Sequence, residues 1–217
     1  MAIAPVSFPP RRAARVAYFA AAANLVAGLM MALALRKGLP IPGNPFDDRI
    51  AFVREHASLW RAGWFSWHAA AVGLVLLMLV LAARFRGRAP VRSMLAAVLA
   101  VAGLAADLAA EAIAMGVSPA VESRDFLLVE SMYGVLTGYL ANGLYSAAGI
   151  LLTWAGAREL PRAVLALGVP VWGAGLWLSA ASLTHSAVGQ LWSTAVLMPL
   201  FVLWAALVGR WLKRNGS

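Results

Sequence analysis

Six apolar stretches, each of about 20 residues or more, constrain this chain more than any other feature of its sequence. They cover residues 13–35, 62–83, 93–115, 127–154, 163–184 and 191–212. Hydrophobic residues make up 62% of the chain and charged residues 12%, about half of the roughly 25% that soluble domains carry. Because so much apolar surface cannot be buried in one water-soluble core, we predict an all-α fold, an integral membrane bundle of six transmembrane helices.

The six stretches predict a single domain. We expect residues 1–12 to form a mobile N-terminal lead, residues 13–212 the six-helix transmembrane domain, and residues 213–217 a cytoplasmic tail. The first stretch follows arginines and ends in Met-Ala-Leu-Ala, as a secretory signal would. Its apolar run exceeds the roughly 7–15 residues of such signals, and further stretches follow, so we interpret it as a retained first helix.

The longest loop, residues 36–61, combines an irregular segment with a short helix. Its first part is rich in Pro and Gly, which favours irregular backbone. In DRIAFVREHASLW, residues 48–60, one helical face carries Ile50, Val53, Ala57 and Trp60. We predict an amphipathic helix on the membrane surface within this first outer loop. Aromatic anchors at the headgroup level are then expected at Trp60, Trp64 and Trp67.

The positively charged residues indicate how the bundle is oriented. Six spans place both termini on one side, and that side carries Arg11, Arg12, Arg15, Arg84, Arg86, Arg88, Arg92, Arg158, Arg162, Arg210, Lys213 and Arg214. The other side carries the smaller set Arg36, Lys37, Arg49, Arg54, Arg61 and Arg124. Since cytoplasmic loops are enriched in Lys and Arg, we predict a multi-pass protein of the bacterial cytoplasmic (inner) membrane with both termini in the cytoplasm.

The net charge of +9 also bears on the partners of the chain. The basic residues lie in loops and at helix ends, where they attract anionic lipid headgroups, and no nucleic-acid-binding pattern accompanies them. We therefore expect the lipid bilayer as a partner and no nucleic acid. Other membrane subunits or a second copy of the chain remain open as further partners.

Two acids stand within the third apolar stretch. Asp107 and Glu111 are one helical turn apart in SMLAAVLAVAGLAADLAAEAIAM, residues 93–115. A carboxylate in hydrocarbon costs several kcal/mol, so it normally faces a partner or water and marks a functional site. Two carboxylates at this spacing repel each other unless a proton or a cation lies between them.

The predicted orientation brings other ionisable residues to a similar depth. At a rise of ~1.5 Å per residue, His68 lies ~9 Å below the outer end of the second span. Glu130 lies ~5 Å inside the fourth span, and His185 lies at the outer end of the fifth. We expect an acidic pocket open to the outer face, with Asp107, Glu111, His68 and Glu130 as ligand- or proton-binding residues. The alternative for each of these four residues is a structural role in the bundle or at a helix end.

Metal binding is a further hypothesis for the same region. Histidine and carboxylate ligands suit zinc, iron or manganese, and the candidates are His68, Asp107, Glu111 and His185. The sequence has no cysteine and no HExxH spacing, and it contains no haem, flavin or nucleotide motif. Asn24 and Asn142 are expected to form hydrogen bonds between packed helices.

Three segments of the first half carry a resemblance. They read RRAARVAYFAAAANLVAG, DDRIAFVREHASLWRAGWFSWHAAAVGLVLL and AGLAADLAAEAI. An Arg-led first helix, an outer helix ending in Leu-Trp-Arg and a Trp-rich second span resemble an uncharacterised family of bacterial multi-pass membrane proteins, a domain of unknown function. The resemblance implies about six helices in a bacterial membrane, and it supplies no activity and no functional residues.

Three functions remain open from the sequence. The leading hypothesis is a binding or transport protein whose outer-facing acidic pocket takes a cation, a proton-coupled solute or a lipid headgroup. Asp107 would be its protonatable or cation-binding centre, adjusted by Glu111 and His68. One alternative is a metal-assisted intramembrane enzyme acting on outer-leaflet lipid. Another is a non-catalytic subunit of a membrane complex.

Overall fold

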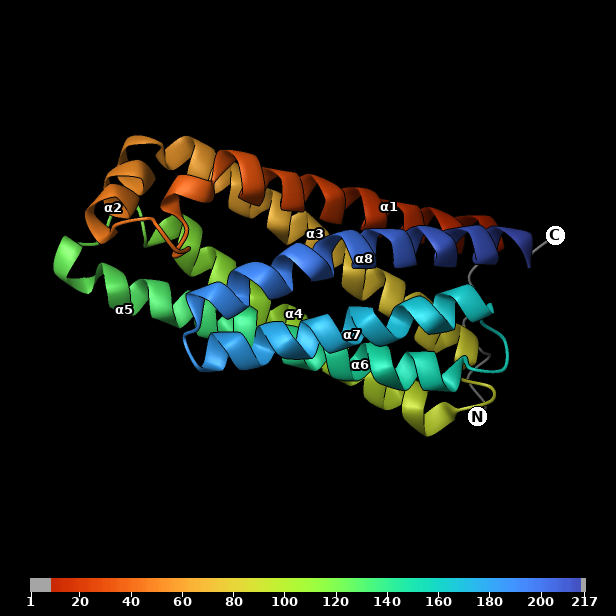
Figure 1. Cartoon of the computed structure of the whole chain (residues 1–217). Coiled ribbons are helices and arrows are strands. Elements are labelled where there is room, and N and C mark those ends of the chain that lie inside the picture. The colour runs from red at the N-terminus through yellow and green to blue at the C-terminus, as the bar shows by residue number, and fades with distance from the viewer. Residues whose placement is uncertain (1–8, 216–217) are drawn as a thin grey trace, which may run out of the picture.

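The computed structural model describes residues 9–215, and these form helices without strands (Figure 1). In chain order the α-helices and the three shorter π- and 3₁₀-helices, marked η, are α1 Pro10–Leu29, η1 Met30–Ala34, η2 Arg36–Gly38, α2 Phe46–Glu55, α3 Ala57–Phe85, α4 Pro90–Gly116, α5 Ser123–Gly134, η3 Val135–Ala141, α6 Asn142–Ala155, α7 Arg162–Leu183 and α8 Ala187–Arg214. The π-helices η1 and η3 continue α1 and α5 without a break.

Six of the helical segments are long and apolar enough to cross a membrane. They are Pro10–Ala34, Ala57–Phe85, Pro90–Gly116, Ser123–Ala155, Arg162–Leu183 and Ala187–Arg214. Each contains one of the apolar stretches of the sequence. The prediction of an all-α chain with six long apolar helices is therefore confirmed for the described residues.

The ends of several helices differ from the prediction. The first helix begins at Pro10 and so includes the last three residues of the expected lead, because proline is well suited to the first turn of a helix. The rest of that lead, residues 1–8, lies outside the described residues, as do residues 216–217 of the expected tail. Lys213 and Arg214 belong to α8.

The expected surface helix is shorter than predicted, and two of the three tryptophans expected as anchors are buried in the bundle. The chain turns at His56, so α2 ends at Glu55, and Trp60 belongs to α3. Trp60 and Trp64 are buried, and the Trp60 indole Nε1 donates a hydrogen bond to the Ala114 carbonyl at 2.8 Å. These two rings pack α3 against its neighbours within the bundle.

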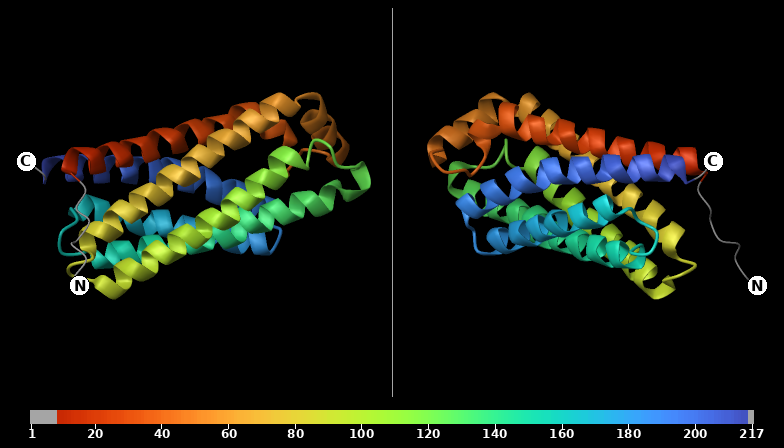
Figure 2. Two further views of the ribbon diagram at one scale, coloured as in Figure 1. Left: turned by 180° about the vertical axis from the view of Figure 1, so that it is seen from behind. Right: turned by 45° about the vertical axis from the view of Figure 1, so that its right-hand side comes forward.

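The helices run roughly along one axis, with the start of α1 and the end of α8 at the same end of the bundle (Figure 2). α1 packs against α3 and α8, α4 against α3 and α6, and α7 against α6 and α8. Alanines such as Ala17 and Ala20 on α1 are fully buried, which lets the backbones approach closely. This order places α4, the helix with both membrane-level acids, between α3 and α6.

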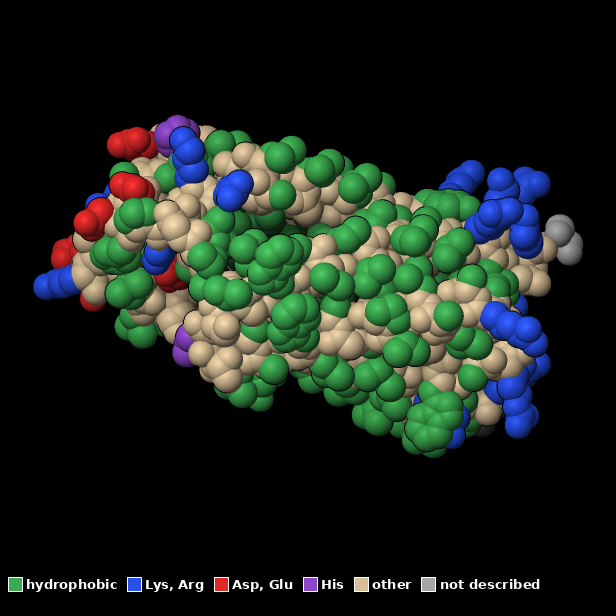
Figure 3. Space-filling view, viewed as in Figure 1, with side chains coloured by type: hydrophobic (Ala, Val, Ile, Leu, Met, Phe, Trp, Pro, Cys, Tyr) green, Lys and Arg blue, Asp and Glu red, His purple; other side chains and the backbone are tan. Residues whose placement is uncertain are grey.

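The molecule has an apolar lateral surface and charged ends (Figure 3). Lys and Arg side chains gather at the end where α1 begins and α8 ends. The one acid in the loop between α6 and α7, Glu159, pairs there with Arg84 and Arg88 at 3.5 and 3.2 Å. The opposite end, which holds α2, carries acidic, basic and histidine side chains together.

Candidate functional site

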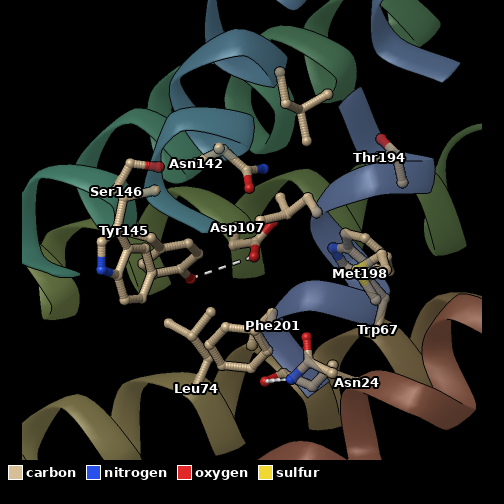
Figure 4. A pocket seen from close by; sticks show the side chains of 16 residues that line it. Asn24, Trp67, Leu74, Asp107, Asn142, Tyr145, Ser146, Thr194, Met198 and Phe201 are labelled. Atoms are coloured by element: carbon tan, nitrogen blue, oxygen red, sulfur yellow. Dashed lines mark hydrogen bonds between the residues drawn. The ribbon is translucent and has the colours of Figure 1, made fainter. Parts of the chain in front are cut away.

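Two cavities meet inside the half of the bundle that holds α2. The larger, of about 840 Å³, lies among α1, η1, α3, α5, η3, α7 and α8. The smaller is a chamber of about 40 Å³ that also reaches α4 and α6 (Figure 4). Residues that line both cavities are Asn24, Trp67, Asn142, Leu178, Thr194 and Met198. The chamber therefore adjoins the larger cavity and shares part of its wall.

Asp107 lines the chamber from α4. Its residue is 2% exposed, and the Tyr145 hydroxyl donates a hydrogen bond to its Oδ2 at 3.3 Å. Thr137 and Trp67 also approach this carboxylate, while its Oδ1 has no hydrogen-bond partner. Within residues 9–215, no lysine, arginine or histidine forms an ion pair with it. A buried carboxylate without a cationic partner is costly, so it marks a place where a ligand adds stability.

Asn24 and Asn142 present acceptor atoms to the same chamber. The Asn24 Nδ2 donates to the carbonyls of Ala20 and Ala70, at 2.9 and 3.2 Å, and thereby links α1 to α3. The Asn142 Nδ2 donates to the Thr137 carbonyl at 2.7 Å, within its own span. Since a carbonyl only accepts, these bonds fix the amide groups with Oδ1 free to accept another bond.

The π-helix η3 explains the position of Asn142 and Thr137. A π-helix bonds a backbone N–H to the carbonyl five residues earlier, and the backbone N–H of Asn142 bonds to the Thr137 carbonyl with this spacing. At Gly138, in the same segment, an added Cβ would overlap the Ser182 side chain of α7. The second π-helix, η1, lines the larger cavity with Met31 and Ala32. Such segments occur frequently at functional sites because they redirect side chains without ending the helix.

Several buried polar atoms without a hydrogen-bond partner face the two cavities. Besides Asp107 Oδ1 they are Trp64 Nε1, Glu130 Oε1, Tyr133 Oη and Thr137 Oγ1. Buried polar groups are almost always satisfied in folded proteins. Water or a polar ligand group in the cavities would satisfy these five atoms.

Glu111 and His68 form a pair apart from the cavities. The His68 Nδ1 and the Glu111 Oε2 are 2.6 Å apart, with side chains 36% and 0% exposed. Neither residue lines the chamber or the larger cavity. The His68 ring stacks on Phe65, with ring centroids 6.0 Å apart. The two acids of α4 therefore divide: Asp107 faces the chamber, and Glu111 faces His68 of α3.

Glu130 lines the larger cavity but already has a cationic partner. Its Oε2 accepts a hydrogen bond from the Arg49 Nη2 at 2.8 Å, and both side chains are nearly buried. The pair connects α2 to α5. Glu130 therefore differs from Asp107, because its negative charge is balanced within the chain.

His185 lies at the edge of the larger cavity and is exposed. Its φ of 52° is the only positive value among the described residues other than glycine, and it follows the end of α7. Between Pro9 and Asn215, no group of three or more His, Asp or Glu side chains could hold a metal ion. His68, Asp107, Glu111 and His185 are thus not gathered as a metal site, since α4 directs its two acids to different neighbours.

The sequence did not identify Tyr145, Thr137 or Trp67 as partners of Asp107. Tyr145 lies one residue from the small-residue series Gly134, Gly138, Asn142 and Ser146, which does indicate the face of that span that packs closely. The π-helix shifts that face by part of a turn, and composition carries no sign of it.

Comparisons of the chain with models of protein families, with curated proteins and with solved structures found no match. The functional proposal therefore depends on the geometry of the cavities and their lining residues.

Proposed function

We propose that this chain is a six-span integral membrane protein of binding or transport type, whose ligand carries a positive charge to Asp107. The observation that supports it most is the imbalance among the membrane-level acids. Glu130 pairs with Arg49 and Glu111 with His68, whereas Asp107 is buried at a cavity without a cationic partner in the described chain. A cation in the chamber would balance this charge, since buried charges are normally paired.

The distribution of charge supports a location and an orientation within the proposal. The end of the bundle with both terminal helices is rich in Arg and Lys, which is typical of a cytoplasmic face. Both termini then lie in the cytoplasm of a bacterial cell, and the protein lies in the inner membrane. The α2 end faces outward, with α2 as an amphipathic helix at the outer surface and the larger cavity in the outer half of the bilayer.

The proposal is tested by cation-dependent stabilisation of the purified protein in maltoside micelles. We expect methylammonium chloride to raise the unfolding temperature of the wild type by several degrees, because a ligand at 100 times its Kd stabilises by about 2.7 kcal/mol. Sodium and potassium chloride at equal ionic strength serve as comparisons. Asp107→Asn should remove the methylammonium effect.

A matched control separates the site from general charge. Asp125→Asn makes the same chemical change at an exposed acid in the first turn of α5. This control should keep the full stabilisation by methylammonium. If Asp107→Asn and Asp125→Asn respond to methylammonium as the wild type does, or if the wild type gains no stability, the proposed site is wrong.

A further inference from the structure

We propose that the ligand is a membrane-dissolved amphiphile with a primary ammonium head and an apolar chain, and that it reaches Asp107 sideways, between α1–η1 and the first half of α8. This inference rests on the proposed function, because the acidic chamber supplies the site for the head. It adds the chemical class of the ligand and the route by which it arrives.

The chamber matches a primary ammonium group in its acceptors. Asp107 Oδ1 and the Oδ1 atoms of Asn24 and Asn142 are free to accept, since both amide nitrogens are engaged with backbone carbonyls. In Figure 4 the two amide oxygens point toward Asp107 from opposite sides. A primary ammonium group offers three N–H donors and no acceptor. The volume of about 40 Å³ suits such a small head, because one water needs roughly 10–15 Å³ by the same measure.

The larger cavity matches an apolar chain. Its volume of about 840 Å³ falls within the roughly 300–1,000 Å³ of pockets that hold small molecules. Its wall toward α1 and α8 is mostly apolar, with Leu25, Leu29, Leu191, Met198 and Val202. The charged residues of its wall, Arg36 and Glu130, belong to the α2 end, where Arg49 balances Glu130. An amphiphile therefore fits with its head at the chamber and its chain toward the lateral wall.

The lateral wall is open between two helices. α8 bends near its middle and diverges from α1 toward the α2 end (Figures 1 and 2). Pro199 lies inside α8 at this point, and a proline removes the helical hydrogen bond to the residue four positions earlier, here Ala195. Leu25 and Leu29 are each 50% exposed on one side of the gap, and Leu191 is 39% exposed on the other. Hydrocarbon-facing side chains thus surround the opening.

Met198 is the contact that crosses this gap. The three atoms nearest to a Cβ added at Gly28 of α1 would all belong to Met198, the first of them at 3.4 Å. Met198 also lines both cavities, so it stands between the opening and the chamber. A methionine has three rotatable bonds and adapts easily to a passing apolar chain.

The other side of the larger cavity is covered by a loop that hydrogen bonds hold in place. Leu39, Pro40 and Ile41 line the cavity from this loop. Asn44 Nδ2 donates to the carbonyls of Arg36 and Leu39 at 2.6 and 3.0 Å, and Arg49 Nη1 donates to the Asn44 carbonyl at 3.1 Å. Backbone held in this way opens less easily than a gap bordered by flexible side chains such as Met198. The sideways route is therefore the easier one.

The test compares methyl-, butyl- and octylammonium on the full-length protein in maltoside micelles, with octyltrimethylammonium and octanol as matched probes. We expect Kd to fall at least tenfold from methyl- to octylammonium, because each buried CH₂ adds favourable transfer free energy. Octyltrimethylammonium, which has no N–H donor, should bind at least tenfold more weakly than octylammonium, and octanol should not bind competitively.

Two substitutions test the route. Ala195→Trp and Leu29→Trp each place a large ring at the opening from opposite helices, and each should slow octylammonium association at least fivefold. Val196→Trp, on an exposed α8 position outside the cavity lining, should leave octylammonium association and methylammonium affinity unchanged. Unliganded melting curves verify that each variant folds.

The outcomes separate the inference from the proposed function. If methylammonium binds through Asp107 while chain length, N–H donors and the tryptophan substitutions have no effect, the amphiphile and its route are wrong and the acidic site stands. If neither methylammonium nor octylammonium binds in an Asp107-dependent way, both proposals are wrong.

Discussion

The two halves of the bundle are built differently, although the same six helices run through both. On the side of the chamber toward the termini, the Trp204 indole packs against Trp172 and Phe201, two rings of the chamber wall, with ring centroids 5.0 and 5.9 Å away, and α1 contributes fully buried alanines. On the side toward α2, two spans change to π-helix, a proline lies inside α8, and the larger cavity is lined by both apolar and polar side chains. We expect the first half to contribute more of the stability and the second to hold most of the candidate site, because a site requires irregular, unsatisfied structure.

The largest effect is expected in the packed half. Trp204→Ala removes a ring that is 1% exposed and should lower the free energy of unfolding by about 3–5 kcal/mol, because the surrounding rings lose their contacts and leave a cavity. Denaturant unfolding in mixed micelles measures it. Trp192→Ala, on an exposed α8 position, is the control and should change stability little. Equal effects of the two substitutions would show that this half isn't the more tightly packed one.

The next effect concerns the ion pair that connects α2 to α5 in the α2 half. Arg49→Met keeps an unbranched side chain like the aliphatic part of arginine but leaves the Glu130 carboxylate buried without its cation, which should cost about 3 kcal/mol. The double variant Arg49→Met with Glu130→Gln removes both charges and should recover most of the loss. A thermal unfolding cycle of the four proteins measures the coupling. A double variant as unstable as Arg49→Met alone would contradict this explanation.

Hydropathy predicted the six helices because a span of about 20 apolar residues is a property of composition. Other features depend on which helices become neighbours. Asp107 and Glu111 differ by about 40° around a helix, so α4 can direct one to α6 and the other to α3. We expected both acids in one pocket because the sequence does not show which helices become neighbours. The π-helices and Pro199 of α8 lie beside the cavities, and a π-helix has no signal in the composition of the sequence.

A third prediction reverses the sign of the first two. Asp107→Asn should raise the free energy of unfolding of the ligand-free protein by about 1–2 kcal/mol, because it replaces a buried, unbalanced carboxylate with a neutral group of the same shape. The same variant should bind methylammonium at least about 30-fold more weakly. Melting curves with and without the ligand measure both. A loss of stability would mean that Asp107 supports the fold, and the contrast between the two halves would then fail at its main residue.

The smallest effect distinguishes the two acids of α4. In His68→Gln the new amide can donate a hydrogen bond to Glu111 in place of the imidazole contact, so the free energy of unfolding should change by less than about 1 kcal/mol. Neither residue lines a cavity, so methylammonium affinity should change by no more than about twofold. Titration of His68→Gln beside Asp107→Asn compares them directly. A loss of affinity in His68→Gln as large as in Asp107→Asn would join the His68–Glu111 pair to the site, and the binding region would then extend through α4 to the surface where His68 stacks on Phe65.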